Sequence, residues 1–195
     1  ARRRPGSTWA TCATDAKILR HGRHPALGAL PAPFGHEVTG EVVACGAQVG
    51  DDLLGRSVVV ANSAPCLRCR SCVRGRLSLC EDLTYLWGTY AEYVRVPARI
   101  VAHNLLSRPA GLAPQLAPLV EPLACAVNAV SRSDAAAGDR VVILGAGTQG
   151  QFLTACLVAR GCEVIVCDPH EPRRARALRF GASQTHDAPR DAEQI

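Results

Sequence analysis

The sequence predicts an α/β protein of two domains, in which a mostly-β domain is followed by the start of a parallel sheet. Three observations lead to this: short β-branched segments broken by glycine, four closely spaced cysteines, and a strand–helix–strand–helix pattern after residue 140. We expect the first domain to cover residues 1–120, with a cysteine lobe at 64–82, and the second domain to cover residues 121–195.

The first domain contains segments with the composition of strands. EVTGEVVACG (37–46) and GRSVVVAN (55–62) are rich in β-branched residues, and Gly50, Asp51 and Asp52 predict a turn between them. TYAEYVRVPARIVAH (89–103) alternates enough to predict two more strands, with Pro97 at a turn. A proline-rich loop then precedes a helical segment, LACAVNAVSRS (123–133).

Four cysteines lie within fifteen residues, at positions Cys66, Cys69, Cys72 and Cys80. Two-residue gaps allow neighbouring thiolates to turn toward one point about 2.3 Å away, as tetrahedral Zn²⁺ requires. A four-thiolate site has no open position for water, so such a zinc ion would be structural. A disulfide pair or four unrelated buried cysteines are the alternatives, but nothing else in the chain indicates an oxidising compartment.

Composition excludes several other classes of function. The formal net charge of +5 comes from 22 Lys and Arg against 17 Asp and Glu, but the bases are dispersed and aromatic residues make up only 4%, so we expect no nucleic-acid partner. No apolar run approaches the roughly eighteen residues of a membrane span, and no signal peptide is visible. Because six cysteines are scattered through apolar segments, we expect a reducing, cytoplasmic location.

From Arg140 onward the pattern changes to that of a βαβ unit with a parallel sheet. VVILGAGTQG (141–150) predicts a strand followed by a glycine-rich turn, and QFLTACLVARG (151–161) predicts a helix. CEVIVCD (162–168) predicts the second strand, PHEPRRARALRFG (169–181) the second helix, and residues 182–187 a third strand.

Gly145, Gly147 and Gly150 form a G-x-G-x-x-G turn between this strand and helix. The first glycine allows a tight turn, the second lets the backbone approach a pyrophosphate, and the third lets the helix pack on the strand. We expect the pyrophosphate of a dinucleotide at the N-terminal end of the helix predicted over Gln149–Arg160, beside Thr148 and Gln149.

Asp168 ends the second strand, where an acid would bond the adenosine ribose hydroxyls and favour NAD over NADP. Arg173 and Arg174 lie close enough to meet a 2′-phosphate instead. NAD is therefore the favoured cofactor and NADP the alternative.

Cys12, His36 and Glu37 have the chemistry of an open, catalytic zinc site, and Glu121 is a further acid at the start of the following helix. Each has an ordinary alternative. A single histidine before a strand is usually a surface or core residue, and Glu121 could simply favour a helix N-terminus.

Five motifs occur in the order found in the zinc-dependent medium-chain alcohol dehydrogenases: the Cys12–Asp15 segment, Gly35-His36-Glu37, the four-cysteine lobe, Glu121-Pro122-Leu123 and GAGTQG. The chain resembles the sorbitol and threonine dehydrogenase branch, because Glu121 replaces the cysteine of ethanol-type members. The resemblance extends from about Thr8 to Ala182.

This resemblance implies a GroES-like catalytic domain, a truncated Rossmann domain, one catalytic zinc and one structural zinc. Cys12 and His36 would bind the catalytic zinc, with Glu37 or Glu121 as the third ligand, and Thr14 would begin a proton relay. Lys17 stands where many relatives carry the outer histidine of that relay.

The activity implied is hydride transfer between NAD(P) and a secondary alcohol of a polyol, cyclitol or amino alcohol. The partner would be a small alcohol or ketone, and the full-length form a homo-oligomer, either a dimer or a tetramer. Because family chains are roughly twice as long as a single domain of this kind, we expect a fragment of a dehydrogenase. A catalytically silent zinc-binding module of the same fold is the alternative.

Overall fold

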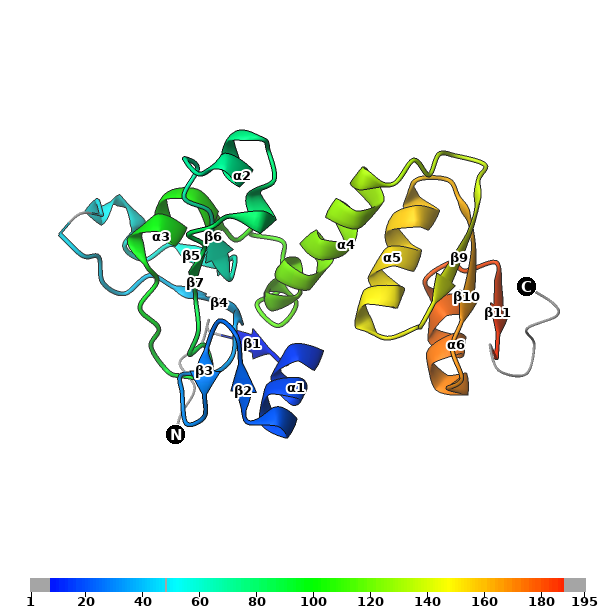
Figure 1. Ribbon diagram of the computed structural model, residues 1–195, viewed down its shortest axis with the longest axis horizontal. Helices are drawn as coiled ribbons and strands as arrows, with labels where there is room; N and C mark the ends of the chain where they lie inside the picture. The colour runs from blue at the N-terminus through cyan, green and yellow to red at the C-terminus, as the bar shows by residue number, and fades with distance from the viewer. Residues whose placement is uncertain (1–7, 48, 188–195) are drawn as a thin grey trace. The chain divides into compact units, whose positions relative to one another are not determined.

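A computed structural model describes residues 8–47 and 49–187. Its contacts divide the chain into two compact units, Ala1–Glu121 and Pro122–Ile195. Figure 1 shows short strands and loops in the first unit and layered helices and strands in the second. Within the described residues, every helix is too short or too polar to cross a membrane.

The first unit is organised around an antiparallel sheet of order β1-β4-β5-β8. These strands are Thr8–Ala10, Glu37–Glu41, Ser57–Val60 and Leu105–Ser107. β-Branched residues meet across β4 and β5, where Val38 pairs with Val60 and Thr39 with Val59. Val58 and Val60 bury their side chains in a core with Leu86 and Ile100.

Shorter elements complete this unit. They are α1 (Ala13–His21), the β2–β3 hairpin (Arg23–His24 and Gly28–Ala29), η1 (Asp51–Leu53), β6 (Ser63–Ala64), α2 (Arg70–Val73), η2 (Leu77–Leu79), β7 (Thr84–Tyr85), α3 (Ala98–Asn104) and η3 (Ala117–Leu119). The short pair formed by β6 and β7 closes the base of the cysteine lobe.

The prediction of two strands over residues 89–103 is wrong. Residues 89–97 form no strand, and α3 begins directly after Pro97, whose φ of −58° suits a helix start. Val94 and Val96 nevertheless pack against the core. The alternating pattern of residues 89–97 therefore reflects burial of one side of an irregular segment, without strand pairing.

The second unit has a parallel sheet of order β11-β10-β9, as the βαβ pattern predicts. Its strands are β9 (Arg140–Leu144), β10 (Glu163–Cys167) and β11 (Gln184–His186), with helices α5 (Thr148–Ala159) and α6 (Glu171–Arg179) between them. The predicted third strand is confirmed. Ile143, Leu157, Val164 and Val166 form the centre of its core. Helix α4 (Val120–Arg132) begins three residues before the predicted helical segment.

Candidate metal centres and nucleotide-binding turn

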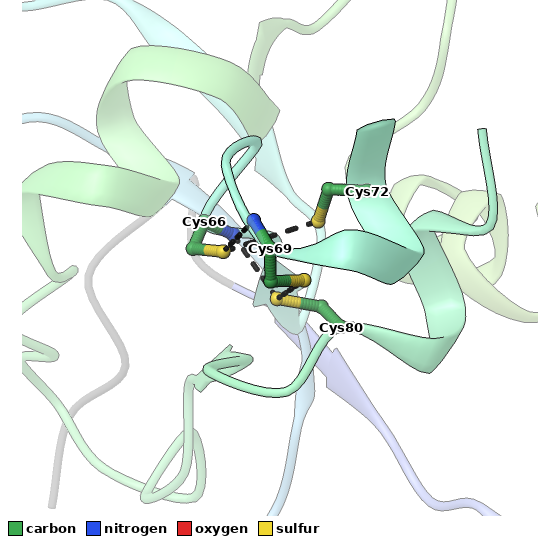
Figure 2. A group of neighbouring side chains, drawn as sticks. All are labelled: Cys66, Cys69, Cys72 and Cys80. Atoms are coloured by element: carbon green, nitrogen blue, oxygen red, sulfur yellow. Dashed lines mark hydrogen bonds between the residues drawn. The ribbon is translucent and has the colours of Figure 1, made fainter. Parts of the chain in front are cut away.

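The four cysteines of the lobe converge on one point, as Figure 2 shows. Their sulfurs all lie within 4.8 Å of one another, and the Cys66–Cys72 and Cys69–Cys80 pairs are each 4.0 Å apart. Four sulfurs bound tetrahedrally at 2.3 Å from zinc lie about 3.8 Å apart, whereas a disulfide joins sulfurs at about 2.0 Å. These four residues, the cysteine cage, have the spacing of a zinc site rather than of a disulfide. All four are free thiols.

Backbone N–H groups point at these sulfurs. The N–H of Cys66 donates to Cys80 Sγ (3.2 Å), and that of Cys69 donates to Cys66 Sγ (3.4 Å). Backbone hydrogen bonds from Arg68 and Cys69 lower the pKa of Cys66 to about 6, which favours the thiolate that a metal needs. Burial raises the pKa of the Cys72 thiol to about 12, an effect that a nearby dication reverses.

A second group brings together Cys12, His36 and Glu37, whose ligand atoms also lie within 4.8 Å of one another. The strand register explains how residues so distant in sequence meet. Ala10 of β1 pairs with Glu37 of β4, so the chain continuing from β1 places Cys12 beside the start of β4. His36 and Glu37 are 5% and 2% exposed, and sulfur, imidazole and carboxylate together form a ligand set suited to zinc.

Asp15 connects two members of this group. Its Oδ2 accepts a hydrogen bond from the Cys12 N–H (2.8 Å), completing a capping box in which Cys12 is the N-cap of α1. Its Oδ1 lies 3.1 Å from His36 Nδ1. The two atoms lie close together but are not aligned for a hydrogen bond.

With Nδ1 turned toward Asp15, Nε2 is the nitrogen of His36 left to bind a metal. Metal-binding histidines commonly direct their other ring nitrogen to a carboxylate in this way. The sequence motifs leave Asp15 without a role, although the Cys-x-x-Asp spacing of a capping box is visible.

Two acids face the same site: Glu37 is buried and Glu121 is half-buried. Burial raises the pKa of Glu37, and the charges of Glu121 and Asp15 raise it further, while His36 and Cys12 oppose the shift. Burial likewise raises the pKa of Glu121, and His36 opposes it. Acids with raised pKa values gathered around a histidine are typical of functional sites. Glu37 belongs to the close ligand group, whereas Glu121 lies outside it but within electrostatic reach.

Thr14 lies beside the Cys12 thiol, because its N–H donates to Cys12 Sγ at 3.4 Å. Lys17, one turn further along α1, is exposed. On the histidine side, the ring of Trp87 packs edge-on against His36 at 5.4 Å. Nothing in the sequence near Trp87 indicates this contact with His36.

The glycine turn has the predicted geometry. Gly145 follows β9 with φ of +98°, a conformation that favours glycine. A Cβ on Gly150 would lie 1.9 Å from the Gly145 carbonyl oxygen, whereas one on Gly147 would meet no protein atom within 4 Å. Thr148 and Gln149 begin α5, and no side chain within the described residues caps its N-terminus. The backbone N–H groups of this first turn are therefore suitable for a phosphate.

Asp168 follows β10 directly and lies next to this turn. Its Oδ2 accepts from the Ala146 N–H and its Oδ1 from the His170 N–H, both at 2.8 Å, and the Arg173 guanidinium lies 3.6 Å away. Burial alone would raise its pKa, but the hydrogen bonds from His170 and Ala146 and the charge of Arg173 lower it overall. Asp168 thus holds the glycine turn through its hydrogen bond with the Ala146 N–H. The sequence did not indicate this contact.

Comparison with known proteins agrees with this arrangement. Residues 7–106 match the family described as the alcohol dehydrogenase GroES-like domain. L-galactonate-5-dehydrogenase of Escherichia coli (strain K12) is 35% identical over 167 residues, covering 84% of this chain and 47% of the relative. L-threonine 3-dehydrogenase of Pyrococcus furiosus is 38% identical over 177 residues, covering 88% and 49%.

The crystal structure of galactitol-1-phosphate dehydrogenase from Escherichia coli superposes with a TM-score of 0.80 at 27% identity, covering 95% of this chain and 53% of that one. The chain spans about half the length of the curated relatives it matches. Sequence, family match and fold therefore agree, and the chain belongs to the zinc-dependent medium-chain alcohol dehydrogenase family.

Proposed function

We propose that this chain carries the catalytic domain and the first part of the coenzyme-binding domain of an NAD(P)-dependent zinc oxidoreductase. The reaction is hydride transfer between the nicotinamide and a secondary alcohol. The observation that carries the proposal is the group formed by Cys12, His36 and Glu37, whose ligand atoms lie within 4.8 Å of one another. A fourth, open position for substrate distinguishes such a site from the closed cysteine cage.

Each residue has a definite task in this proposal. Cys12, His36 and Glu37 hold the catalytic zinc, and Asp15 orients His36 from behind. Glu121 supplies a second carboxylate within electrostatic reach of the site. A zinc ion held there polarises an alcohol oxygen and lowers the pKa of the hydroxyl. The hydroxyl of Thr14, a residue whose backbone N–H donates to Cys12 Sγ, would accept the released proton and pass its own proton toward solvent.

The cysteine cage supplies the structural zinc. Cys66, Cys69, Cys72 and Cys80 occupy all four tetrahedral positions, so this ion has no place for substrate. Its task is to hold the lobe.

The second unit would bind the dinucleotide. Gly147 and the first turn of α5, with Thr148 and Gln149, would hold the pyrophosphate. Asp168 and Arg173 lie at the end of β10, where the adenosine ribose binds in such folds. The ionised carboxylate of Asp168 supports NAD, and Arg173 leaves NADP as the alternative.

For the substrate, we propose a polyol, cyclitol or amino alcohol. The names of the two relatives given above, which concern L-galactonate and L-threonine, support a secondary alcohol in a polar molecule. A reducing, cytoplasmic location and a homo-oligomeric full-length form remain predictions.

Metal content tests the proposal directly. We expect two zinc ions per purified chain by elemental mass spectrometry, one in Cys12→Ser, and two in the control Cys45→Ser, because Cys45 belongs to neither metal group. NAD titration and turnover on a panel of polyols and amino alcohols complete the test. If the unmodified chain held a single zinc ion and Cys69→Ser lost it, the cysteine cage would be its site. That result would refute the catalytic-metal assignment. A folded chain that binds no dinucleotide would support the silent zinc-binding module instead.

A further inference from the structure

Tyr90 reaches the metal-candidate group from a distant part of the chain. Its hydroxyl donates to Asp15 Oδ2 at 2.7 Å, across a separation of 75 residues, and also lies 3.2 Å from the Ala10 carbonyl oxygen. Burial, reinforced by Asp15, raises the pKa of Tyr90 to about 12, so the phenol keeps its proton at neutral pH. Tyr90 therefore acts as a hydrogen-bond donor toward a carboxylate.

The ring of Tyr90 is held in place by its neighbours. It packs edge-on against Phe34 at 5.3 Å and against Trp9 at 6.4 Å. Gly35 has φ of +88°, and a Cβ there would lie 2.9 Å from Tyr90 Cγ, so the backbone approaches the ring as closely as glycine permits. The packing of the ring therefore fixes the position of the Tyr90 hydroxyl.

The two oxygens of Asp15 have separate tasks. Asp15 is 1% exposed, so water cannot freely replace a missing partner. Oδ2 receives both the Cys12 N–H and the Tyr90 hydroxyl, while Oδ1 faces His36 Nδ1. Rotation about the terminal torsion of an aspartate is soft. Two donors on one oxygen restrict that rotation and keep the other oxygen toward the histidine.

We propose that Tyr90 is a positioning residue for the catalytic metal site: its hydroxyl fixes the Asp15 carboxylate, which in turn directs His36 Nε2 toward the metal. This inference rests on the proposed role of His36 as a ligand. Tyr90 touches neither metal nor substrate in this scheme and acts through Asp15.

The test is the Co²⁺ affinity of the 195-residue chain, measured by letting the protein and a coloured chelator compete for Co²⁺. Tyr90→Phe removes one oxygen and keeps the ring that packs on Phe34 and Trp9. We expect affinity at the Cys12–His36–Glu37 group to fall about tenfold, the lower end for groups that orient metal-bound histidines. Affinity of the cysteine cage should not change. Tyr85→Phe makes the same chemical change at an exposed tyrosine and should leave both affinities unaltered.

A double-mutant cycle with Asp15→Asn separates positioning from general packing. If Tyr90 acts through Asp15, Tyr90→Phe has no further effect on affinity in the Asp15→Asn background. The nitrogen NMR signal of His36 Nδ1 should also shift in Tyr90→Phe and not in Tyr85→Phe. Equal losses at both metal groups, full additivity in the cycle, or a Tyr90→Phe chain that does not fold would each overturn the inference.

The two proposals fail in different ways. A chain that binds metal only in the cysteine cage refutes the proposed function. A chain that binds two ions with the same affinities in Tyr90→Phe as in the unmodified form refutes the positioning role alone.

Discussion

At the scale of single residues, the glycines of the turn differ in how strictly the protein's own packing requires them. Gly150 is needed because any Cβ would collide with the Gly145 carbonyl. Gly147 has φ of −69°, which any residue adopts, and open space where its Cβ would be. The same motif thus contains one position that the protein's own packing restricts to glycine and one position that it does not.

We therefore expect Gly150→Ala and Gly147→Ala to differ. Gly150→Ala should lower the free energy of unfolding of the second unit by about 1–3 kcal/mol, because the strand–helix packing must open. Gly147→Ala should change it less, by at most about 1 kcal/mol for placing alanine at the N-cap of α5, yet weaken dinucleotide binding. Urea unfolding and NAD titration measure the two effects. Equal destabilisation by both variants would contradict the assignment.

At the scale of elements, the cysteine lobe has little apolar packing of its own. Val73 of α2 is 76% exposed and Leu79 of η2 is 62% exposed, while Cys72 is buried. The two elements are short, four and three residues, so they have little intrinsic stability. Such a lobe is expected to depend on its metal for folding.

Cys69→Ser should consequently unfold the lobe without unfolding the chain. We expect loss of one zinc ion and rapid amide exchange over α2 and η2, with protection of β5 retained, because β5 is paired on both sides. Hydrogen–deuterium exchange with mass spectrometry measures this. Cys45→Ser is the control and should keep full protection. A lobe that stays protected after losing its zinc would show that packing suffices.

The elements also show what the sequence could predict. The cysteine cage and the glycine turn depend on spacing within fifteen residues or fewer, so local geometry was enough to predict both. Residues 89–97 were mistaken for a strand, because one-sided burial of Val94 and Val96 produces the same alternation as strand pairing. The Asp15–Tyr90 contact was missed, because 75 residues separate its members and no periodicity links them.

At the scale of the whole molecule, the described residues form two separate apolar cores. One includes Val58, Val60 and Ile100 of the first unit, and the other includes Val164 and Val166 of the second. Both candidate metal groups of the described residues belong to the first unit. Metal binding should therefore stabilise the first unit directly and leave the second dependent on its own core.

Matched core substitutions test this independence. Val60→Ala and Val166→Ala each remove two buried methyl groups and should each cost about 2 kcal/mol. Scanning calorimetry measures the midpoint temperature of each unfolding transition. We expect Val60→Ala to lower the midpoint of only one transition, the one whose midpoint a zinc chelator also lowers. Val166→Ala should lower the midpoint of only the transition that the chelator leaves unchanged, because Val166 belongs to the second core. One cooperative transition that moves in both variants would mean that the units fold as one, and that loss of zinc also destabilises the glycine turn.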